Sequence, residues 1–289
     1  MKNKLGRRNV FLLLLLSCSL LGLRAQGVVC TKGDSARVVA LLTEARRQPA
    51  KTNWMLWFGR KFIGVPYVGG TLDKGRDEQL VVNLHELDCT TYVEQVMALT
   101  LCAEKKATRF ADFCNALRHV RYIGGRVAYT ARQHYFTAWI NDNVKEGLVT
   151  DIQQPNPPFS AVQKIRVNWM TTHVSSYKML SAHRQWLGGI RDLENSINGK
   201  RYRYIPKRLL HDSSLLRRCI KNGDILVMIT SKKGLDTAHI GIAVWGRDGQ
   251  LHLLNASSLH HRVIEEPRSL YEYQQRQRTQ IGIRVCRVR

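Results

Sequence analysis

The stretch "LHELDCTTYVEQVMALTL", residues 84–101, changes its hydrophobic pattern at Asp88. Apolar positions then recur at helical spacing, at Tyr92, Val93, Val96 and Met97. Because aspartate is a common helix-capping residue, the pattern predicts a helix whose first turn contains Cys89. Unpaired N–H groups and the positive end of the helix dipole would lower the pKa of a thiol at that position. Cys89 is therefore either a nucleophile at a helix start or a small buried residue.

A cysteine nucleophile also needs a base within hydrogen-bond reach and a polar group that orients the base. His239 begins the strand-like segment "HIGIAVWG" (239–246), and Asn255 lies in the next one, "QLHLLNAS" (250–257). The intervening "RDG" (247–249) is typical of a three-residue hairpin loop. That loop would place His239 opposite Ser257 and Asn255 on the same face, two residues away. A two-residue loop would turn Asn255 to the other face, so a Cys–His–Asn site depends on this register.

The rest of the chain favours helices first and strands last. Helical spacing appears in residues 35–47, 109–122 and 134–147, and strand-like runs occupy residues 223–230, 239–246, 250–257, 262–266 and 281–288. Gly- and Pro-rich composition predicts loops at 62–73 and 153–160. Helices followed by an antiparallel meander indicate an α+β fold, with the Cys89 helix packed on the sheet. Trp139, Cys102, Cys114 and Cys286 lie inside helix or strand patterns and are expected to be buried.

Residues 1–25 have a basic start, the apolar run "VFLLLLLSCSLLGL" (10–23) and a small residue, Ala25, at a plausible cleavage point. This pattern is typical of a secretory signal peptide. We therefore expect a signal peptide over 1–25, one domain over 26–289 with N-terminal and middle helical insertions, and export to a bacterial periplasm or cell envelope. An uncleaved membrane anchor and lipid attachment at Cys18 are the alternatives.

The chain carries a formal charge of +23, which falls to +18 without residues 1–25, because these contain five basic and no acidic residues. Such a charge suggests an anionic partner, although a solvated basic surface would also explain it. The sequence has no zinc-finger, helix-turn-helix or aromatic–basic RNA-binding pattern, so a cell-wall polymer fits better than nucleic acid. The remaining six cysteines include no CxxC pair, and we expect no metal or cofactor. The protein is expected to be a monomer.

Several segments together resemble the NlpC-type papain-like cell-wall cysteine peptidases. These are "PYVGGTLD" (66–73), "LDCTTYVEQV" (87–96), "NGDILVM" (222–228), "LDTAHIGIAVW" (235–245) and "LHLLNASS" (251–258). Three more are similar to a branch regarded as N-acetylmuramoyl-L-alanine amidases: "TARQHYFTAWINDN" (130–143), "VNWMTTHVSSY" (167–177) and "YRYIPK" (202–207). The resemblance extends from about Trp54 onward and implies a papain-like core with helical elaborations.

The resemblance implies that Cys89 is the nucleophile, His239 the base and Asn255 the polar third member. Tyr67 matches a tyrosine that lines the site. Asp88 precedes the nucleophile as in the family, where it contacts substrate or caps the helix. Thr90 and Thr91 replace the usual Ser-Gly after "DC". This departure, with the long span from Cys89 to His239, favours the amidase branch over D-glutamyl endopeptidases.

Two further residues are candidates for substrate binding. Peptide stems of peptidoglycan carry carboxylates, so an arginine is expected in the cleft, and Arg132 lies in a segment similar to the amidase branch. A surface role for Arg132 remains the alternative. Asp236, three residues before His239, could bind a substrate amide or start the strand turn.

The resemblance implies an exported cysteine amidase that cleaves the bond between N-acetylmuramic acid and L-alanine in peptidoglycan or muropeptides. One alternative is an endopeptidase that cuts between D-glutamate and the diamino acid of the stem. The other is a non-catalytic cell-wall binding module that kept the fold.

Overall fold

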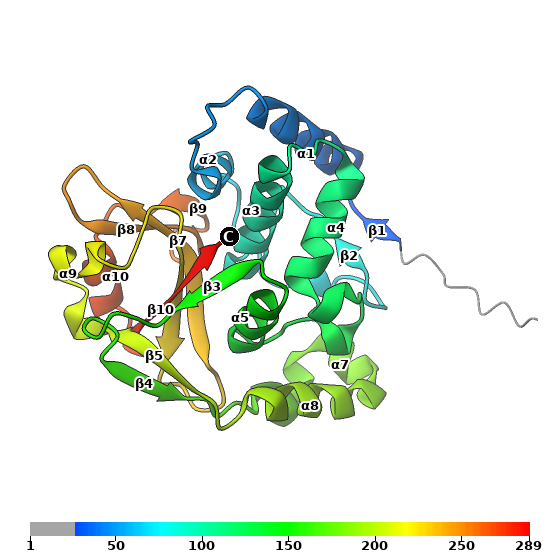
Figure 1. Ribbon diagram of the computed structural model, residues 1–289. Coiled ribbons are helices and arrows are strands. Elements are labelled where there is room, and N and C mark those ends of the chain that lie inside the picture. Colours follow the sequence, from blue (N-terminus) through cyan, green and yellow to red (C-terminus); the bar gives the residue numbers. More distant parts are fainter. Residues whose placement is uncertain (1–26) are drawn as a thin grey trace, which may run out of the picture.

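A central helix, α3, lies between an antiparallel sheet and a group of further helices (Figure 1). The computed structural model describes residues 27–289. The predicted signal peptide and Cys18 lie outside the described residues. The described helices are α1 (Lys32–Ala45), α2 (Trp54–Arg60), α3 (Cys89–Glu104), α4 (Phe110–Arg121), α5 (Phe136–Lys145), α6 (Trp169–Thr172), α7 (Lys178–Ala182), α8 (Leu187–Ile197), α9 (Ser213–Arg217) and α10 (Leu270–Gln275).

The main sheet has eight strands in the order β4-β5-β10-β6-β7-β8-β9, with β3 paired to β10. Its strands are β3 (Val149–Ile152), β4 (Ala161–Lys164), β5 (Arg201–Pro206), β6 (Ile225–Thr230), β7 (Thr237–Trp245), β8 (Leu251–Ser257), β9 (Arg262–Glu265) and β10 (Gln280–Val288). A separate parallel pair joins β1 (Val28–Val29) to β2 (Leu80–Val81). The five strands expected in the last third are thus confirmed, as are the helices expected at 35–47, 109–122 and 134–147 and the helix that starts at Cys89.

The order of the last strands differs from the predicted meander. Strands β6 to β9 follow one another, but β10 pairs with β6 instead of continuing beyond β9. The short helix α10 carries the chain from β9 back to the other side of β6. Because β10 also pairs with β3 and β5, it becomes a central strand of the sheet.

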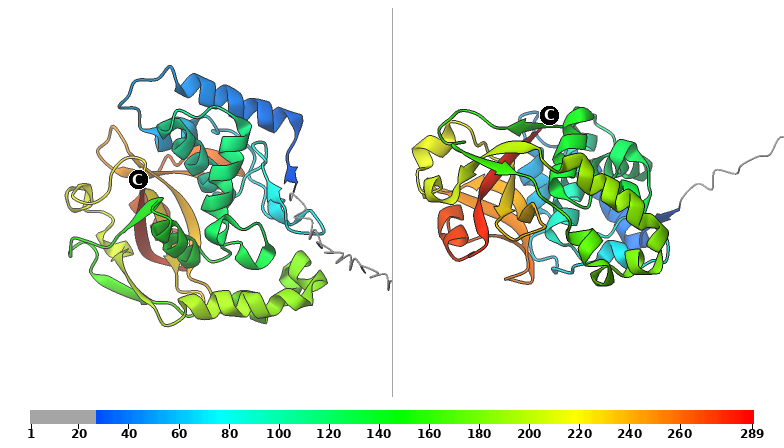
Figure 2. Two further views of the ribbon diagram at one scale, coloured as in Figure 1. Left: turned by 45° about the vertical axis from the view of Figure 1, so that its right-hand side comes forward. Right: turned by 90° about the horizontal axis from the view of Figure 1, so that it is seen from below.

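Each face of the sheet builds its own core. Ile240, Ile242 and Leu254 belong to the larger core, formed with α1 to α4 on one side. Ala243 and Leu253, which point the other way, pack in a second core with residues of α9 and α10. The two views in Figure 2 show the helices on these opposite sides of the sheet. A third core lies around α8.

Helix α3 is buried around most of its circumference from Thr91 to Cys102, as expected for a helix inside a core. The Asp88 side chain accepts a hydrogen bond from the Thr91 backbone N–H at 2.8 Å, and the Asp88 N–H donates to the Thr91 hydroxyl at 3.0 Å. This capping box fixes the start of the helix at Cys89. The expected burial of Trp139, Cys102, Cys114 and Cys286 is also confirmed. None of the described helices has the length and apolar character needed to cross a membrane.

Candidate active site

Cys89 is the first residue of α3, so its position at a helix start is confirmed. The thiol lies close to the beginning of β7, because the backbone N–H of Ile240 donates a hydrogen bond to it. The Thr90 hydroxyl is 4.0 Å from the sulfur. These contacts bring Cys89, from the first half of the chain, beside the immediate neighbour of His239.

The predicted hairpin register between β7 and β8 is confirmed. Ile242 pairs with Leu254 and Trp245 with Leu251, while the Gly246 N–H donates to the Gln250 carbonyl at 2.9 Å. Residues 247–249 form the loop, and Gly249 has a φ of 79°, a conformation that suits glycine. This is the three-residue loop on which a Cys–His–Asn site depends.

His239 and Asn255 contact each other directly. The His239 Nε2 lies 2.9 Å from the Asn255 Oδ1, and both side chains are buried. With the asparagine oxygen as acceptor, Nε2 carries the proton and Nδ1 keeps its lone pair. The asparagine therefore selects one tautomer of the histidine and leaves the other ring nitrogen able to act as a base.

Burial gives Cys89 a different protonation state from the one expected from the sequence. Surrounding protein and the negative Asp88 raise the thiol pKa to about 12, although the Ile240 N–H and Thr90 oppose the shift. Burial lowers the pKa of His239, against the opposing effects of Asn255 and Asp88. The helix start does not outweigh the cost of surrounding a thiolate with protein, so in the resting state the Cys89 thiol and the His239 imidazole are both neutral.

Two tyrosines lie near the Cys89 sulfur. Tyr67 precedes the turn at Gly70, and its pKa is raised to about 12 by burial and by the nearby Cys89 and Asp88. Tyr273 on α10 also lies near Cys89, and its ring centroid is 6.4 Å from that of His239. No local pattern marks Tyr273 as a site residue, because only the packing of α10 against β8 in the folded chain brings it near His239.

The two aspartates proposed from the sequence both serve as helix caps. Asp88 caps α3 through Thr91, as described above. The Asp236 carboxylate accepts a hydrogen bond of 2.7 Å from the Thr137 backbone N–H, in the first turn of α5. Asp236 is buried, and its contact ties the segment before His239 to a helix. Binding of substrate by either aspartate stays a prediction.

Arg132 is buried among internal partners. Its guanidinium pairs with Asp73, lies 3.6 Å from a Glu78 oxygen, and sits over the Tyr129 ring at 4.9 Å from the centroid. Asp73 ends the loop that carries Tyr67, so this ion pair anchors the loop. A direct contact between Arg132 and substrate stays a prediction.

Gly241 leaves the space that Asn255 occupies. A Cβ at Gly241 would lie 2.9 Å from the Asn255 Cβ and 2.6 Å from a Leu253 methyl group, closer than packed carbons come. We expect Gly241→Ala to displace Asn255 and reduce kcat by about 10- to 100-fold, because small shifts of catalytic groups have effects of that size. Steady-state kinetics measure this effect. Gly188→Ala is the matched control, because nothing lies within 4 Å of its added Cβ. Equal kcat values for the two variants would show that the site tolerates the crowding.

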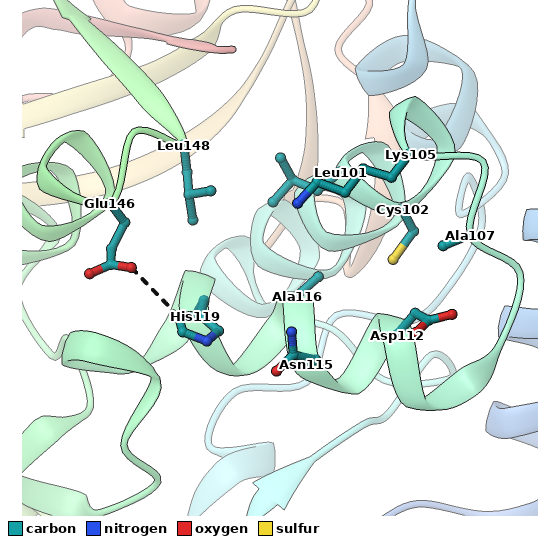
Figure 3. Close-up of a pocket in the computed structure, with 10 residues that line it drawn as sticks. All are labelled: Leu101, Cys102, Lys105, Ala107, Asp112, Asn115, Ala116, His119, Glu146 and Leu148. Carbon is teal, nitrogen blue, oxygen red and sulfur yellow. Dashed lines mark ion pairs between the residues drawn. The ribbon is translucent and has the colours of Figure 1, made fainter.

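A cavity at the other end of α3 is separate from this site. Leu101, Cys102 and Lys105 line it together with residues of α4, and its volume is about 370 Å³ (Figure 3). On its rim, the His119 Nδ1 lies 3.6 Å from a Glu146 oxygen. At 1.5 Å per residue, the cavity is about 20 Å along the helix from Cys89. It therefore takes no part in the arrangement around the thiol.

Comparison with protein families gives one match over most of the chain. A family described as AmiA-like, N-acetylmuramoyl-L-alanine amidase-like, matches residues 57–283, which include Cys89, His239 and Asn255. This chain belongs to the AmiA-like family. Membership assigns the protein to a group of cell-wall amidase-like hydrolases whose substrates derive from peptidoglycan. A comparison with curated proteins finds no match.

Solved structures agree with the AmiA-like assignment. An N-acetylmuramoyl-L-alanine amidase from Bacteroides uniformis ATCC 8492 is 34% identical with a TM-score of 0.76, covering 82% of this chain and 98% of that chain. A protein from Bacteroides fragilis, provisionally named a xylanase, is 36% identical with a TM-score of 0.75, covering 81% and 100%. A Legionella pneumophila protein at 23% identity shares the fold, with a TM-score of 0.71 over 89% and 94% of the two chains.

Proposed function

We propose that this AmiA-like protein is an exported cysteine amidase with a papain-like core. It hydrolyses the amide between N-acetylmuramic acid and L-alanine in peptidoglycan fragments, in the periplasm or cell envelope. The observation that carries the proposal is the contact of the Cys89 thiol, at the start of α3, with the backbone of Ile240, the residue next to His239, which is itself hydrogen-bonded to Asn255. A thiol, a base and a group that orients the base are the parts of a cysteine acyl-transfer site.

The chemistry begins from the neutral pair. As the Cys89 sulfur attacks the lactyl carbonyl, the His239 Nδ1 removes the thiol proton, and a tetrahedral oxyanion forms. Backbone N–H groups at the start of α3 supply positive dipoles for this oxyanion. When the C–N bond breaks, His239 returns the proton to the amine of L-alanine, and the free stem peptide leaves. His239 then activates a water molecule that hydrolyses the muramyl thioester and restores the thiol.

The pH dependence follows from the two shifted groups. The lowered pKa of His239 means that its neutral, active form persists below pH 7 and is lost only as the pH falls through a value under 6.5. The Cys89 pKa of about 12 means that no thiolate forms between pH 7 and 9. We expect kcat/KM to decline only below pH 6.5 and to stay level from pH 7 to 9, as a rate profile would measure. A rise of more than about threefold between pH 7 and 9 would indicate a thiolate nucleophile instead.

Digestion of defined muropeptides identifies the bond that is cut. The amidase releases an intact stem peptide and leaves the sugar without amino acids, which mass spectrometry distinguishes. Products that keep L-alanine and D-glutamate on the sugar would replace the proposal with the endopeptidase alternative. Binding without cleavage would indicate the non-catalytic module. A xylan digest, run in parallel, tests the activity suggested by the name of the Bacteroides fragilis relative.

A further inference from the structure

A groove with a strongly positive lining lies beside the segment that leads to His239. We call it the basic groove, and its cations are Lys164, Arg166, Lys232 and Lys233. The groove has a volume of about 820 Å³, and no aspartate or glutamate is among its lining residues. It lies between the end of β4, the Val167–Asn168 segment and the loop that joins β6 to β7. In Figure 1, β4 lies at the lower edge of the sheet and α8 beside it.

The four cations lack internal partners of opposite charge. None of them forms an ion pair within the part of the chain that the structure describes, and all four side chains are exposed. The Lys232 ammonium lies over the Trp169 ring, 4.1 Å from its centroid, which holds one charge in place. Like charges gathered in a groove repel one another and attract an anionic ligand.

Hydrogen bonds hold the loop that forms one wall of the groove. Gly234, with a φ of 81°, accepts backbone hydrogen bonds of 3.2 Å from both Asn168 and Trp169. A Cβ at Gly234 would lie 2.7 Å from the Asn168 Oδ1, so only glycine allows this close approach. Gln163 donates to the Asp236 carbonyl at 2.9 Å, and its own Oε1 is buried without a partner. These contacts hold the loop that carries Lys232 and Lys233 in a defined position relative to β7.

We propose that the basic groove binds the carboxylates of the peptide stem while the amide to be cut lies at Cys89. The inference rests on the proposed function, because it assigns a place to the leaving peptide. His239 lies five positions after Gly234, so the Cα atoms of these two residues are at most about 17 Å apart. An extended stem of three or four residues spans about 10–14 Å, which lies within this limit.

Arg132 is less suited than the groove to bind a carboxylate of the substrate. That guanidinium is already balanced by Asp73 and Glu78, so its charge is not available to a second carboxylate without breaking an existing pair. Lys232 and Lys233 form no ion pair within the described residues, and they come shortly before His239 in the chain. The groove therefore offers a carboxylate cations that Arg132 does not.

The test compares two variants of the full chain that lose the same charge. One carries Lys232→Gln and Lys233→Gln in the groove, and the other carries Lys51→Gln and Lys105→Gln, two exposed lysines on the helical side. Two charges are lost together in the groove variant, so we expect its KM for a stem with free carboxylates to rise about tenfold with kcat nearly unchanged. The control should match wild type, and a substrate with amidated carboxylates should bind both variants alike. An equal KM for groove and control variants would overturn the proposal.

Binding of free stem peptide to a Cys89→Ala background separates this inference from the proposed function. Calorimetry should show weaker binding of the stem tripeptide when the groove lysines are also changed, whichever bond the wild-type enzyme cuts. Inorganic polyphosphate is the second probe, because phosphate polymers share the negative charge of the stem. If the groove changes weaken polyphosphate binding and leave tripeptide binding intact, the groove serves a phosphate polymer and the proposal is wrong.

Discussion

Cys89→Ala is expected to reduce kcat/KM for muropeptide hydrolysis by at least about a thousandfold, because the variant lacks the atom that forms the covalent intermediate. The substitution removes only the sulfur, which is surrounded by protein although Cys89 as a residue is partly exposed, so the melting temperature should change little. The kinetic assay and a thermal melt on the same sample separate loss of chemistry from loss of structure. The effect should appear with every substrate that the wild type cleaves.

Cys30→Ala is the matched control for this prediction. Cys30 is an exposed free thiol at the start of the described chain, and it takes no part in the arrangement of Cys89, His239 and Asn255. Its removal should leave kcat/KM unchanged. If activity survives in Cys89→Ala but is lost in a variant of another cysteine, that other cysteine is the nucleophile.

Arg121→Met is expected to lower the free energy of unfolding by about 3–5 kcal/mol, because it leaves a buried carboxylate without its partner. The Arg121 Nε lies 2.6 Å from a Glu94 oxygen, and the two side chains are 1% and 3% exposed. The same guanidinium donates to the Val81 carbonyl at 2.7 Å. The pair thus joins α4 to the helix that carries Cys89 and to β2. Urea denaturation of the variant and the wild type measures the loss.

Two further variants test the cause of this loss. Arg109→Gln breaks the exposed pair with Asp112 and should leave the free energy of unfolding nearly unchanged, because solvent screens exposed ion pairs. Replacing Arg121 with Met together with Glu94→Leu removes both charges and should recover part of the stability lost in Arg121→Met. If the double variant is as unstable as the sum of the single ones, packing rather than an uncompensated charge accounts for the effect.

The sequence predicts the elements of the candidate site because each has a strong local pattern. Asp88 marks the start of α3, and the "RDG" loop fixes the register that brings Asn255 beside His239. The segment "RYRYIP" (201–206) also alternates as a strand should, and this period-two pattern is the local signal of β5.

Other features depend on long-range packing that no local pattern carries. The packing of α10 against β8 brings Tyr273 to the site, and only the complete fold determines that packing. The raised pKa of Cys89 follows from the protein that surrounds α3, whereas the sequence shows only the helix start. Arg132 has the charge expected of a carboxylate-binding residue, but Asp73 and Glu78 meet it only in the folded chain.

The mass of the intermediate trapped on Cys89 tests the central claim most directly. A muropeptide is mixed with the enzyme, the reaction is stopped with acid within milliseconds, and the Cys89 peptide is examined by mass spectrometry. The proposed mechanism predicts an adduct that contains the muramyl sugar and no amino acid. The Cys89→Ala variant should form no such adduct. An adduct that contains the sugar with L-alanine and D-glutamate, or an adduct on another residue, would contradict it.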